Sequence, residues 1–397
     1  MKSTMTNKHR VCVVTSTRAD YGLLSPLIKA LMRKEKIQVE VVATGMHLEE
    51  AYGNTYREIE EDGIAFHKIP IQEKETSENA VSVTMANAIT RFSEFFSKNP
   101  YELMIVLGDR YEILAVSIAA VNAHIPIAHL YGGDTTEGAM DEYYRHAITK
   151  MSYLHFTSTK VAHDRVVQMG ESPSRVFKVG SLGVDNALKV PLLSKNELAA
   201  ELDFLLGEKY GVVTFHPVTM EHDAIEEQMQ QLLAALDQFP DMQFIISKGN
   251  SDVGGNVINR AWEEYAAKHE NVYLTASLGM KKYFSALKYA TMCIGNSSSG
   301  LVEVPSFGIP TVNIGNRQKG REQGNTVFNC EPKAEEIART MRIAMMPENR
   351  EKCALCDNPY GDGNAVGRIV NQIADYLYND KLMLQKEFYL FSGQNIL

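Results

Sequence analysis

Short apolar runs that end in clusters of small and polar residues recur along the whole chain. The run 10–15 (RVCVVT) precedes a polar loop at 16–22, and apolar residues at helical spacing then continue to Leu31. The same order begins again at 39–43 and at 103–107. Strands that alternate with helices are typical of parallel α/β sheets, which bind ligands beyond the carboxyl ends of their strands. The pattern therefore predicts an α/β first domain whose polar loops lie beside a ligand.

A stretch at 187–209 with a helical pattern and charged faces separates this region from a second series of strands, which starts at 211–215. We interpret the stretch as the linker and the entry to a second domain. Two doubly wound Rossmann-like domains that face each other across an interdomain cleft describe the glycosyltransferase-B fold, and this α/β fold class is the one that we predict. The expected boundaries are 1–186 for the first domain and 187–376 for the second, with 377–397 packing back on the first.

Composition narrows the function classes without naming one. The chain has 397 residues, 45% of them hydrophobic and 22% charged, and a net charge of -9 without a basic block, which argues against nucleic acid as a partner. Its five cysteines are too scattered for a disulfide framework, and the pair Cys353 and Cys356 has no second pair with which to hold zinc. The first residues lack the apolar core of a signal peptide, and no stretch of about 20 residues is free of charge. We expect a soluble cytoplasmic protein that binds no membrane.

The stretch 293–322 carries the parts of a nucleotide-diphosphate site. An apolar run meets a turn of small polar residues that includes Ser297 and Ser298, after which an apolar face resumes. This order predicts a strand, a tight turn and a helix N-terminus, whose free N–H groups attract phosphate. Glu303 follows about one turn later, where a carboxylate can accept from ribose hydroxyls, and Arg317 follows the next strand as a phosphate ligand. The simpler alternative is a helix cap made of serines.

The stretch 103–146 is the densest in acidic and basic side chains. Asp109 follows a predicted strand, and Asp134 and Asp141 follow the next one, close to histidine and arginine in the sequence. Crowded carboxylates shift one another's pKa, so one can remove a proton from carbon while another returns one. The alternative is that these residues cap helices and turn the chain. The spacing favours no metal site, and the glycine fingerprint of a dinucleotide site is missing, so we expect neither a metal nor NAD.

Several of these motifs together resemble those of a known family, the hydrolysing UDP-N-acetylglucosamine 2-epimerases of sialic acid biosynthesis. The motifs are spread over nearly the full chain: TRADY at 17–21, TGMH at 44–47, YGNT at 52–55, LGDR at 107–110, RHAITK at 145–150, HP at 216–217 and the whole of 294–322. The resemblance implies elimination of UDP to a 2-acetamidoglucal, followed by addition of water to release N-acetylmannosamine. It also implies UDP and a UDP-sugar as partners, no cofactor, and a homodimer or homotetramer.

The resemblance further assigns roles to individual residues. Asp109, Asp141 and then Asp134 are the expected catalytic carboxylates, and His216 is expected to bind phosphate or to transfer a proton. The residues expected to bind UDP are Arg18, Arg110, Asn250, Leu278, Ser297, Ser298, Glu303 and Arg317, and those expected at the sugar are His47, Glu137 and Arg145.

Two positions depart from the family pattern. Some members carry glutamate where this chain has Tyr131, and several carry glutamate at Asp134. A UDP-2,4-diacetamido-2,4,6-trideoxyglucose (UDP-N,N'-diacetylbacillosamine) hydrolysing epimerase of legionaminic acid biosynthesis is therefore the substrate alternative. A non-hydrolysing epimerase, a glycosyltransferase with an acceptor groove and a nucleotide-sugar binding module are the other interpretations.

Overall fold

The computed structural model describes residues 8–73, 79–136, 140–217, 225–249 and 255–390. These residues fall into two units. The first unit comprises Met1–Thr135, Met140–Leu182 and Gly363–Leu397, and the second comprises Thr136–Ala139 and Gly183–Asp362. Helix α7 (Leu182–Lys189) begins at the point where the chain leaves the first unit.

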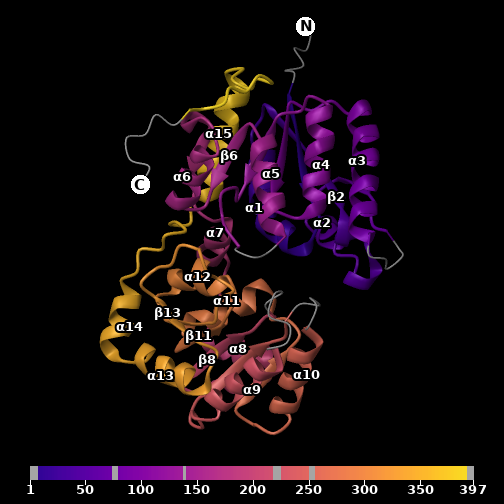
Figure 1. The fold of residues 1–397 in the computed structure, drawn as a ribbon. Coiled ribbons are helices and arrows are strands. Elements are labelled where there is room, and N and C mark those ends of the chain that lie inside the picture. The colour runs from indigo at the N-terminus through magenta and orange to yellow at the C-terminus, as the bar shows by residue number, and fades with distance from the viewer. Residues whose placement is uncertain (1–7, 74–78, 137–139, 218–224, 250–254, 391–397) are drawn as a thin grey trace. The chain divides into compact units, whose positions relative to one another are not determined.

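A seven-stranded parallel sheet forms the centre of the first unit (Figure 1). Its strand order is β3-β2-β1-β4-β5-β6-β7, so the order reverses between β1 and β4. In doubly wound sheets this reversal opens a crevice at the carboxyl edge, and here the loops after β1 and β4 flank it. The strands are β1 (His9–Thr15), β2 (Ile37–Thr44), β3 (Phe66–Ile69), β4 (Leu103–Leu107), β5 (Ile127–Leu130), β6 (Leu154–Thr157) and β7 (Val176–Lys178).

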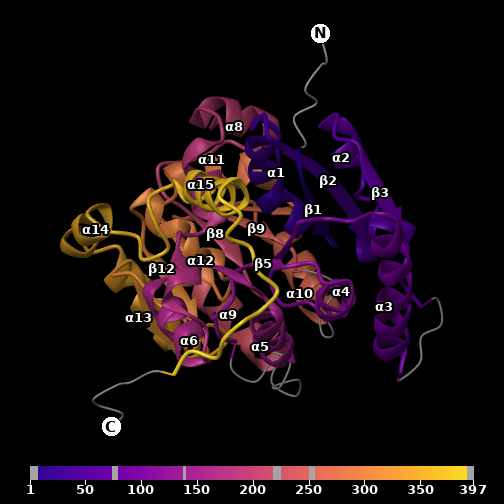
Figure 2. The same ribbon diagram turned by 90° about the horizontal axis from the view of Figure 1, so that it is seen from above.

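Helices cover both faces of this sheet, as Figure 2 shows with α1 and α15 on one side and α4 and α5 on the other. Alternate β1 residues supply the two cores, since Val13 packs with α1 while Val14 packs with α3 and α4. The helices are α1 (Arg18–Met32), α2 (Arg57–Glu61), α3 (Ala80–Lys98), α4 (Tyr111–Asn122), α5 (Asp141–Met151), α6 (Lys160–Gln168) and α15 (Ala365–Tyr378). Short 3-10 turns lie at η1 (Gly45–Leu48), η2 (Glu50–Tyr52) and η3 (Pro173–Arg175).

Helix α15 belongs to the first unit, although the expected second domain extended to residue 376. Its apolar stripe, including Ile369 and Ile373, packs against Leu24 and Leu27 of α1. Figure 1 shows this helix in yellow next to β6 of the first unit. The chain therefore returns to the first unit at Gly363, before the helix and not after it.

The second unit repeats the design with six parallel strands in the order β10-β9-β8-β11-β12-β13. Here the order reverses between β8 and β11, so the loops after these two strands mark the crevice. The strands are β8 (Tyr210–Thr214), β9 (Gln243–Ser247), β10 (Val272–Thr275), β11 (Met292–Gly295), β12 (Thr311–Ile314) and β13 (Val327–Cys330). Two parallel sheets of this kind confirm the predicted fold class of two Rossmann-like domains of the glycosyltransferase-B type.

The helices of the second unit also cover both faces of its sheet. They are α8 (Lys195–Leu202), α9 (Ile225–Leu236), α10 (Gly255–Ala266), α11 (Gly279–Tyr289), α12 (Ser299–Val302), η5 (Val304–Phe307), α13 (Ala334–Ala344) and α14 (Pro347–Ala354). The helical stretch expected at 187–209 is divided, because α7 ends two residues before Pro191 and α8 starts only at Lys195. Along the described ranges, no helix combines the length and the apolar character that crossing a bilayer requires.

Candidate active site

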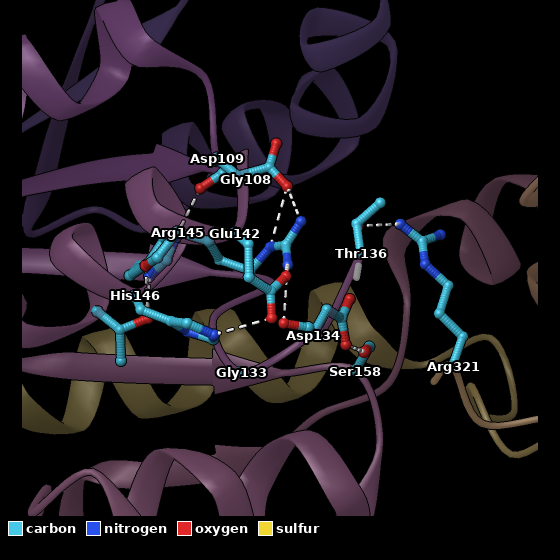
Figure 3. Close-up of polar contacts among 12 residues, drawn as sticks. Gly108, Asp109, Gly133, Asp134, Thr136, Glu142, Arg145, His146, Ser158 and Arg321 are labelled. Atoms are coloured by element: carbon cyan, nitrogen blue, oxygen red, sulfur yellow. Dashed lines mark hydrogen bonds and ion pairs between the residues drawn. The ribbon is translucent and has the colours of Figure 1, made fainter. Parts of the chain in front are cut away.

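A buried guanidinium brings acidic groups together at the carboxyl edge of the first sheet (Figure 3). Arg145 on α5 is only 2% exposed. Its Nε donates to Asp109 Oδ2 at 2.9 Å, and its Nη2 contacts the same oxygen. Its Nη1 donates to Glu142 Oε2 at 2.7 Å and to the Asp134 carbonyl at 2.8 Å. Because a buried charge must be paired, Arg145 holds the ends of β4 and β5 against α5.

The other two predicted carboxylates surround this centre. Asp134 Oδ1 accepts a hydrogen bond from Ser158 Oγ at 2.9 Å, which fixes its side chain at the end of β6 (Figure 3). Asp141 is the first residue of α5, one helical turn before Arg145. Desolvation and the negative charge of Asp109 raise the pKa of Asp141 above its usual range. The geometry thus brings Asp109, Asp134 and Asp141 together around Arg145. Asp141, which retains its proton more readily, lies near Asp109, which is paired with Arg145.

Glu112, to which the sequence analysis gave no role, lies buried in the first turn of α4 at 1% exposure. Its Oε1 accepts from Arg110 Nε, while its Oε2 has no hydrogen-bond partner within the described part of the chain. A buried carboxylate oxygen without a partner is unfavourable unless a ligand or water supplies a donor. The signal in the sequence was its place three residues after Asp109 at a strand end. Glu112 and Arg110 are therefore candidates for contact with a polar ligand.

Two further predicted residues of the first unit differ in their surroundings. Arg18 starts α1 at the end of β1 with 59% of its side chain exposed, and its Nε pairs with Glu58 at 2.7 Å. His47 is fully buried, and its ring nitrogens contact Thr15 Oγ1 at 3.0 Å and Thr55 Oγ1 at 2.8 Å. Burial lowers the pKa of His47 to about 4. Two threonines already bond its ring nitrogens, and contact of His47 with the sugar stays a prediction.

In the second unit, Asn296 links the ends of three adjacent strands. Its side chain accepts from the His216 N–H at 2.7 Å and donates to the His216 carbonyl at 2.8 Å. Its own carbonyl accepts from Arg317 Nη1 at 3.2 Å and from Gln318 Nε2 at 2.8 Å. The geometry therefore brings the predicted His216 and Arg317 to the serine turn that follows β11. Asn296 was not among the predicted site residues, although it is the first polar residue after that strand.

Glycines give the serine turn its shape. A Cβ on Gly295, which has a φ of +131°, would lie 1.9 Å from the Thr214 carbonyl oxygen. A Cβ on Gly300 would lie 2.7 Å from Thr311 Cγ2. Ser297 and Ser298 lie between these two glycines and are partly buried. The helix expected after them is only α12, four residues long, so its dipole is weak and anion binding would depend on local N–H and hydroxyl groups.

Glu303 directly follows α12, close to the partly buried Tyr283. Tyr283 donates to Ser299 Oγ at 2.8 Å, and Ser299 in turn bonds the Glu303 carboxylate. Desolvation raises the pKa of Glu303 to about 7. The side chain of the predicted Leu278 is 4% exposed and lies in the core, so only its backbone can meet a ligand. Asn250 and Glu137, also predicted site residues, lie outside the described residues.

Arg321 completes the polar groups of the second unit. Its Nη2 donates to Thr136 Oγ1 at 3.3 Å, as Figure 3 shows, and Thr136 clusters with the second unit. Within the described ranges, no three His, Cys, Asp or Glu side chains form a group that could hold a metal ion. The five cysteines are free thiols, among them Cys353 and Cys356.

Two doubly wound units, one with paired carboxylates and one with a glycine-framed serine turn beside arginine, define a protein of the glycosyltransferase-B fold class. A family model described as UDP-N-acetylglucosamine 2-epimerase matches residues 29–374. The chain belongs to this family of enzymes, which confirms the resemblance seen in the motifs.

Curated relatives and solved structures agree with the family. Polysialic acid biosynthesis protein P7 of Escherichia coli is 39% identical over 382 residues, covering 96% of this chain and 97% of that protein. GDP/UDP-N,N'-diacetylbacillosamine 2-epimerase (hydrolyzing) of Campylobacter jejuni is 36% identical over 326 residues, covering 82% of this chain and 85% of that protein. A crystal structure of UDP-GlcNAc 2-epimerase from Neisseria meningitidis bound to UDP-GlcNAc has a TM-score of 0.78 at 19% identity, covering 92% of this chain and 100% of that one. At that identity the structure shows a shared fold alone.

Proposed function

We propose that the protein is a hydrolysing UDP-N-acetylglucosamine 2-epimerase that converts UDP-GlcNAc and water to N-acetylmannosamine and UDP. This reaction would be the first step in making a sialic acid-type sugar. The observation that carries the proposal is the cluster in which buried Arg145 holds Asp109 beside Asp141, in a member of the 2-epimerase family. Removing a proton from a carbon and returning one to it requires one ionised and one protonated carboxyl group, and two carboxyl groups in different surroundings can supply this pair.

The first stage is an anti elimination. A carboxylate, for which Asp109 is the first candidate, removes the proton from C2 of the sugar, and the C1–O bond breaks with its electron pair leaving on UDP. The product is a 2-acetamidoglucal. The C2 proton is weakly acidic, so stabilisation of the leaving diphosphate must supply part of the rate. The groups proposed for this task are Ser297, Ser298, Arg317 and His216 of the second unit, with Arg18 and Arg110 of the first.

The second stage adds water across the double bond with the opposite configuration at C2. Hydroxide equivalent from water bonds to C1, and a carboxylic acid delivers a proton to C2 from the other face. Asp141 is the first candidate for this acid because its raised pKa keeps its proton available. Asp134 is the next candidate. The stereocentre is thus inverted without oxidation, and the chain needs no nicotinamide cofactor for the reaction.

We predict that binding of UDP-GlcNAc weakens as pH falls through 7, provided that Glu303 accepts the ribose hydroxyls. Its pKa of about 7 means that the carboxylate is mainly ionised at pH 8 and mainly protonated at pH 6. If only the ionised form accepts both hydroxyls, affinity drops roughly tenfold over this interval, since it scales with the competent fraction. Calorimetric titration with UDP-GlcNAc at pH 6 and pH 8 measures this change in affinity. It uses the Asp109→Asn variant, in which turnover is suppressed.

The matched control is Glu303→Gln in the same background. The amide does not titrate, so its affinity should be lower at pH 8 and constant between pH 6 and 8. UDP-GlcNAc is the suitable ligand because its diphosphate, esterified at both ends, keeps one charge state over this range. If the affinity of the Glu303→Gln variant for UDP-GlcNAc changes with pH as much as that of the parent protein, Glu303 is not the group that accepts the ribose hydroxyls.

UDP-N,N'-diacetylbacillosamine is the second candidate substrate. The relative from Campylobacter jejuni favours it, because the name of that hydrolysing epimerase gives this sugar as its substrate. The departure at Tyr131 does not add to this case. The tyrosine hydroxyl bonds Ser181 Oγ at 3.0 Å and accepts from the Leu182 N–H at 2.8 Å, so the phenol secures the end of the first unit. The departure at Asp134, a shorter carboxylate than in several members, remains the sequence feature that keeps this alternative substrate open.

Incubation with UDP-GlcNAc in deuterated water tests the reaction and the substrate together. We expect NMR to detect free N-acetylmannosamine with deuterium at C2, because the proton added at C2 comes from solvent. A parallel sample contains UDP-N,N'-diacetylbacillosamine, and turnover of this sugar alone would establish the second candidate. Formation of UDP-N-acetylmannosamine would indicate a non-hydrolysing epimerase. If neither sugar reacts until an acceptor is added, the protein is a glycosyltransferase.

A further inference from the structure

One buried histidine bridges the two segments that carry the carboxylate cluster. His129 lies in β5, is fully buried and has β4 and β6 as neighbours on either side. Its Nε2 lies 2.8 Å from the Gly108 carbonyl oxygen, and its Nδ1 lies 3.2 Å from Thr149 Oγ1. Gly108 directly precedes Asp109, and Thr149 lies one helical turn after Arg145 on α5. The imidazole thus joins the loop that holds Asp109 to the helix that holds its guanidinium partner.

The partners determine which ring nitrogen carries the hydrogen. A carbonyl oxygen only accepts, so Nε2 of His129 must donate to Gly108. Burial lowers the pKa of His129 to about 3, so the ring is neutral over the range in which enzymes work. In a neutral ring Nδ1 is then an acceptor, and the Thr149 hydroxyl beside it shares its one hydrogen between Nδ1 at 3.2 Å and the Arg145 carbonyl oxygen at 2.9 Å. The one hydrogen of the neutral ring is therefore engaged by the Gly108 carbonyl, and the ring is fully buried.

The surroundings leave this ring little freedom. Gly108 has a φ of +79°, and its N–H donates to the Leu130 carbonyl at 3.0 Å. The N–H and the carbonyl of Gly108 are therefore both hydrogen-bonded to residues of β5. A Cβ on Gly132 would lie 2.9 Å from both His129 Nδ1 and Thr149 Oγ1. The absent side chain at 132 thus provides the space in which the ring and the hydroxyl meet.

We propose that His129 is a positioning residue that sets the direction of the Asp109 carboxylate relative to Arg145 through the Gly108 carbonyl. The inference rests on the proposed function, in which Asp109 acts on the C2 proton of the sugar. Small displacements of a reacting group are costly, and about 1 Å can reduce a rate roughly 10²-fold. Loss of the bridge should therefore lower kcat while leaving nucleotide binding intact.

The test compares two substitutions. His129→Phe fills the space but removes both hydrogen bonds, whereas the amide of His129→Gln can still donate to Gly108. We expect His129→Phe to lower kcat by roughly 10- to 100-fold, with KM and the affinity for UDP unchanged, and His129→Gln to recover most of the loss. The matched control is His67→Phe, a substitution at a histidine whose side chain is 47% exposed on β3, which should leave kcat unchanged.

The pH profile separates positioning from proton transfer. In His129→Gln the profile of kcat should keep the limbs of the wild type, and loss of a limb would show that the ring itself moves a proton and would overturn the proposal. An unchanged kcat in His129→Phe would overturn it as well. If that variant does not fold, Thr149→Val decides: a lower kcat at unchanged KM supports the bridge, and a wild-type kcat refutes it.

An NMR measurement keeps this inference distinct from the proposed function. The 13C resonance of the Asp109 carboxyl, assigned by its loss in Asp109→Asn, should shift in His129→Phe and return in His129→Gln. This shift is expected even if wild-type protein turns over neither UDP-sugar. Failure of both substrates with the shift present would refute the epimerase reaction, whereas turnover without the shift would refute the role of His129.

Discussion

Asp109→Asn should reduce turnover of UDP-GlcNAc by roughly 10²- to 10⁴-fold, the usual contribution of a positioned acid or base. The amide cannot take the C2 proton, yet the rest of the cluster stays paired. Arg145 keeps its contacts with Glu142 and with the Asp134 carbonyl, so the first unit should fold as before. Initial rates of UDP release measure turnover, and calorimetry measures UDP binding, which should remain at its wild-type level.

The matched control for this substitution is Asp164→Asn. Asp164 lies on α6 with 56% of its side chain exposed and pairs with Lys160, so the same change of side chain should leave the rate unaltered. If Asp109→Asn instead loses UDP affinity in proportion to its rate, the carboxylate holds the ligand and the base must be sought at Asp134 or Asp141.

Arg145→Met should destabilise the first unit by about 3–5 kcal/mol, the usual effect of removing one partner from a buried ion pair. Methionine fills much of the volume, but Asp109, Glu142 and the Asp134 carbonyl lose their donors together. Urea unfolding followed by circular dichroism should show an earlier transition. The chain has one tryptophan, Trp262, which is buried on α10 in the second unit, so its fluorescence serves as an internal reference.

The control substitution is Arg33→Met, at an exposed arginine just after α1 in the same unit. Exposed sites usually change stability by no more than about 0.5 kcal/mol. An Arg145→Met protein as stable as this control would mean that water replaces the guanidinium at little cost, and the cluster would not be the structural centre of the site.

Local patterns were sufficient to predict the positions of several strands. The run at 103–107 coincides with β4, and the run at 211–215 is offset by one residue from β8, because polar residues lie close to both ends of each run. The assignment of α15 to a unit needed more than pattern. An apolar stripe shows that a helix is buried, but it does not show which of two sheets covers it.

The same limit applies to the site. Asp109 and Ser297 could be proposed as site residues because each follows an apolar strand, where α/β proteins bind ligands. The part played by Arg145 could not, since it depends on contacts with three segments that are far apart in the sequence. Nor did the sequence pattern reveal that α12 ends after four residues, although Pro305 lies shortly beyond it, in the tighter turn η5.

The late return of the chain to the first unit affects the order in which the two units can fold during translation. Domains generally fold one after another as they leave the ribosome, the N-terminal one first. Here α15 supplies Ile369, Ile373 and Leu377 to the core beside α1, and translation reaches these residues only after all of the second unit. The nascent first sheet must therefore wait with part of one apolar face uncovered until the second unit has been translated, whereas the second unit needs no later segment to complete its core.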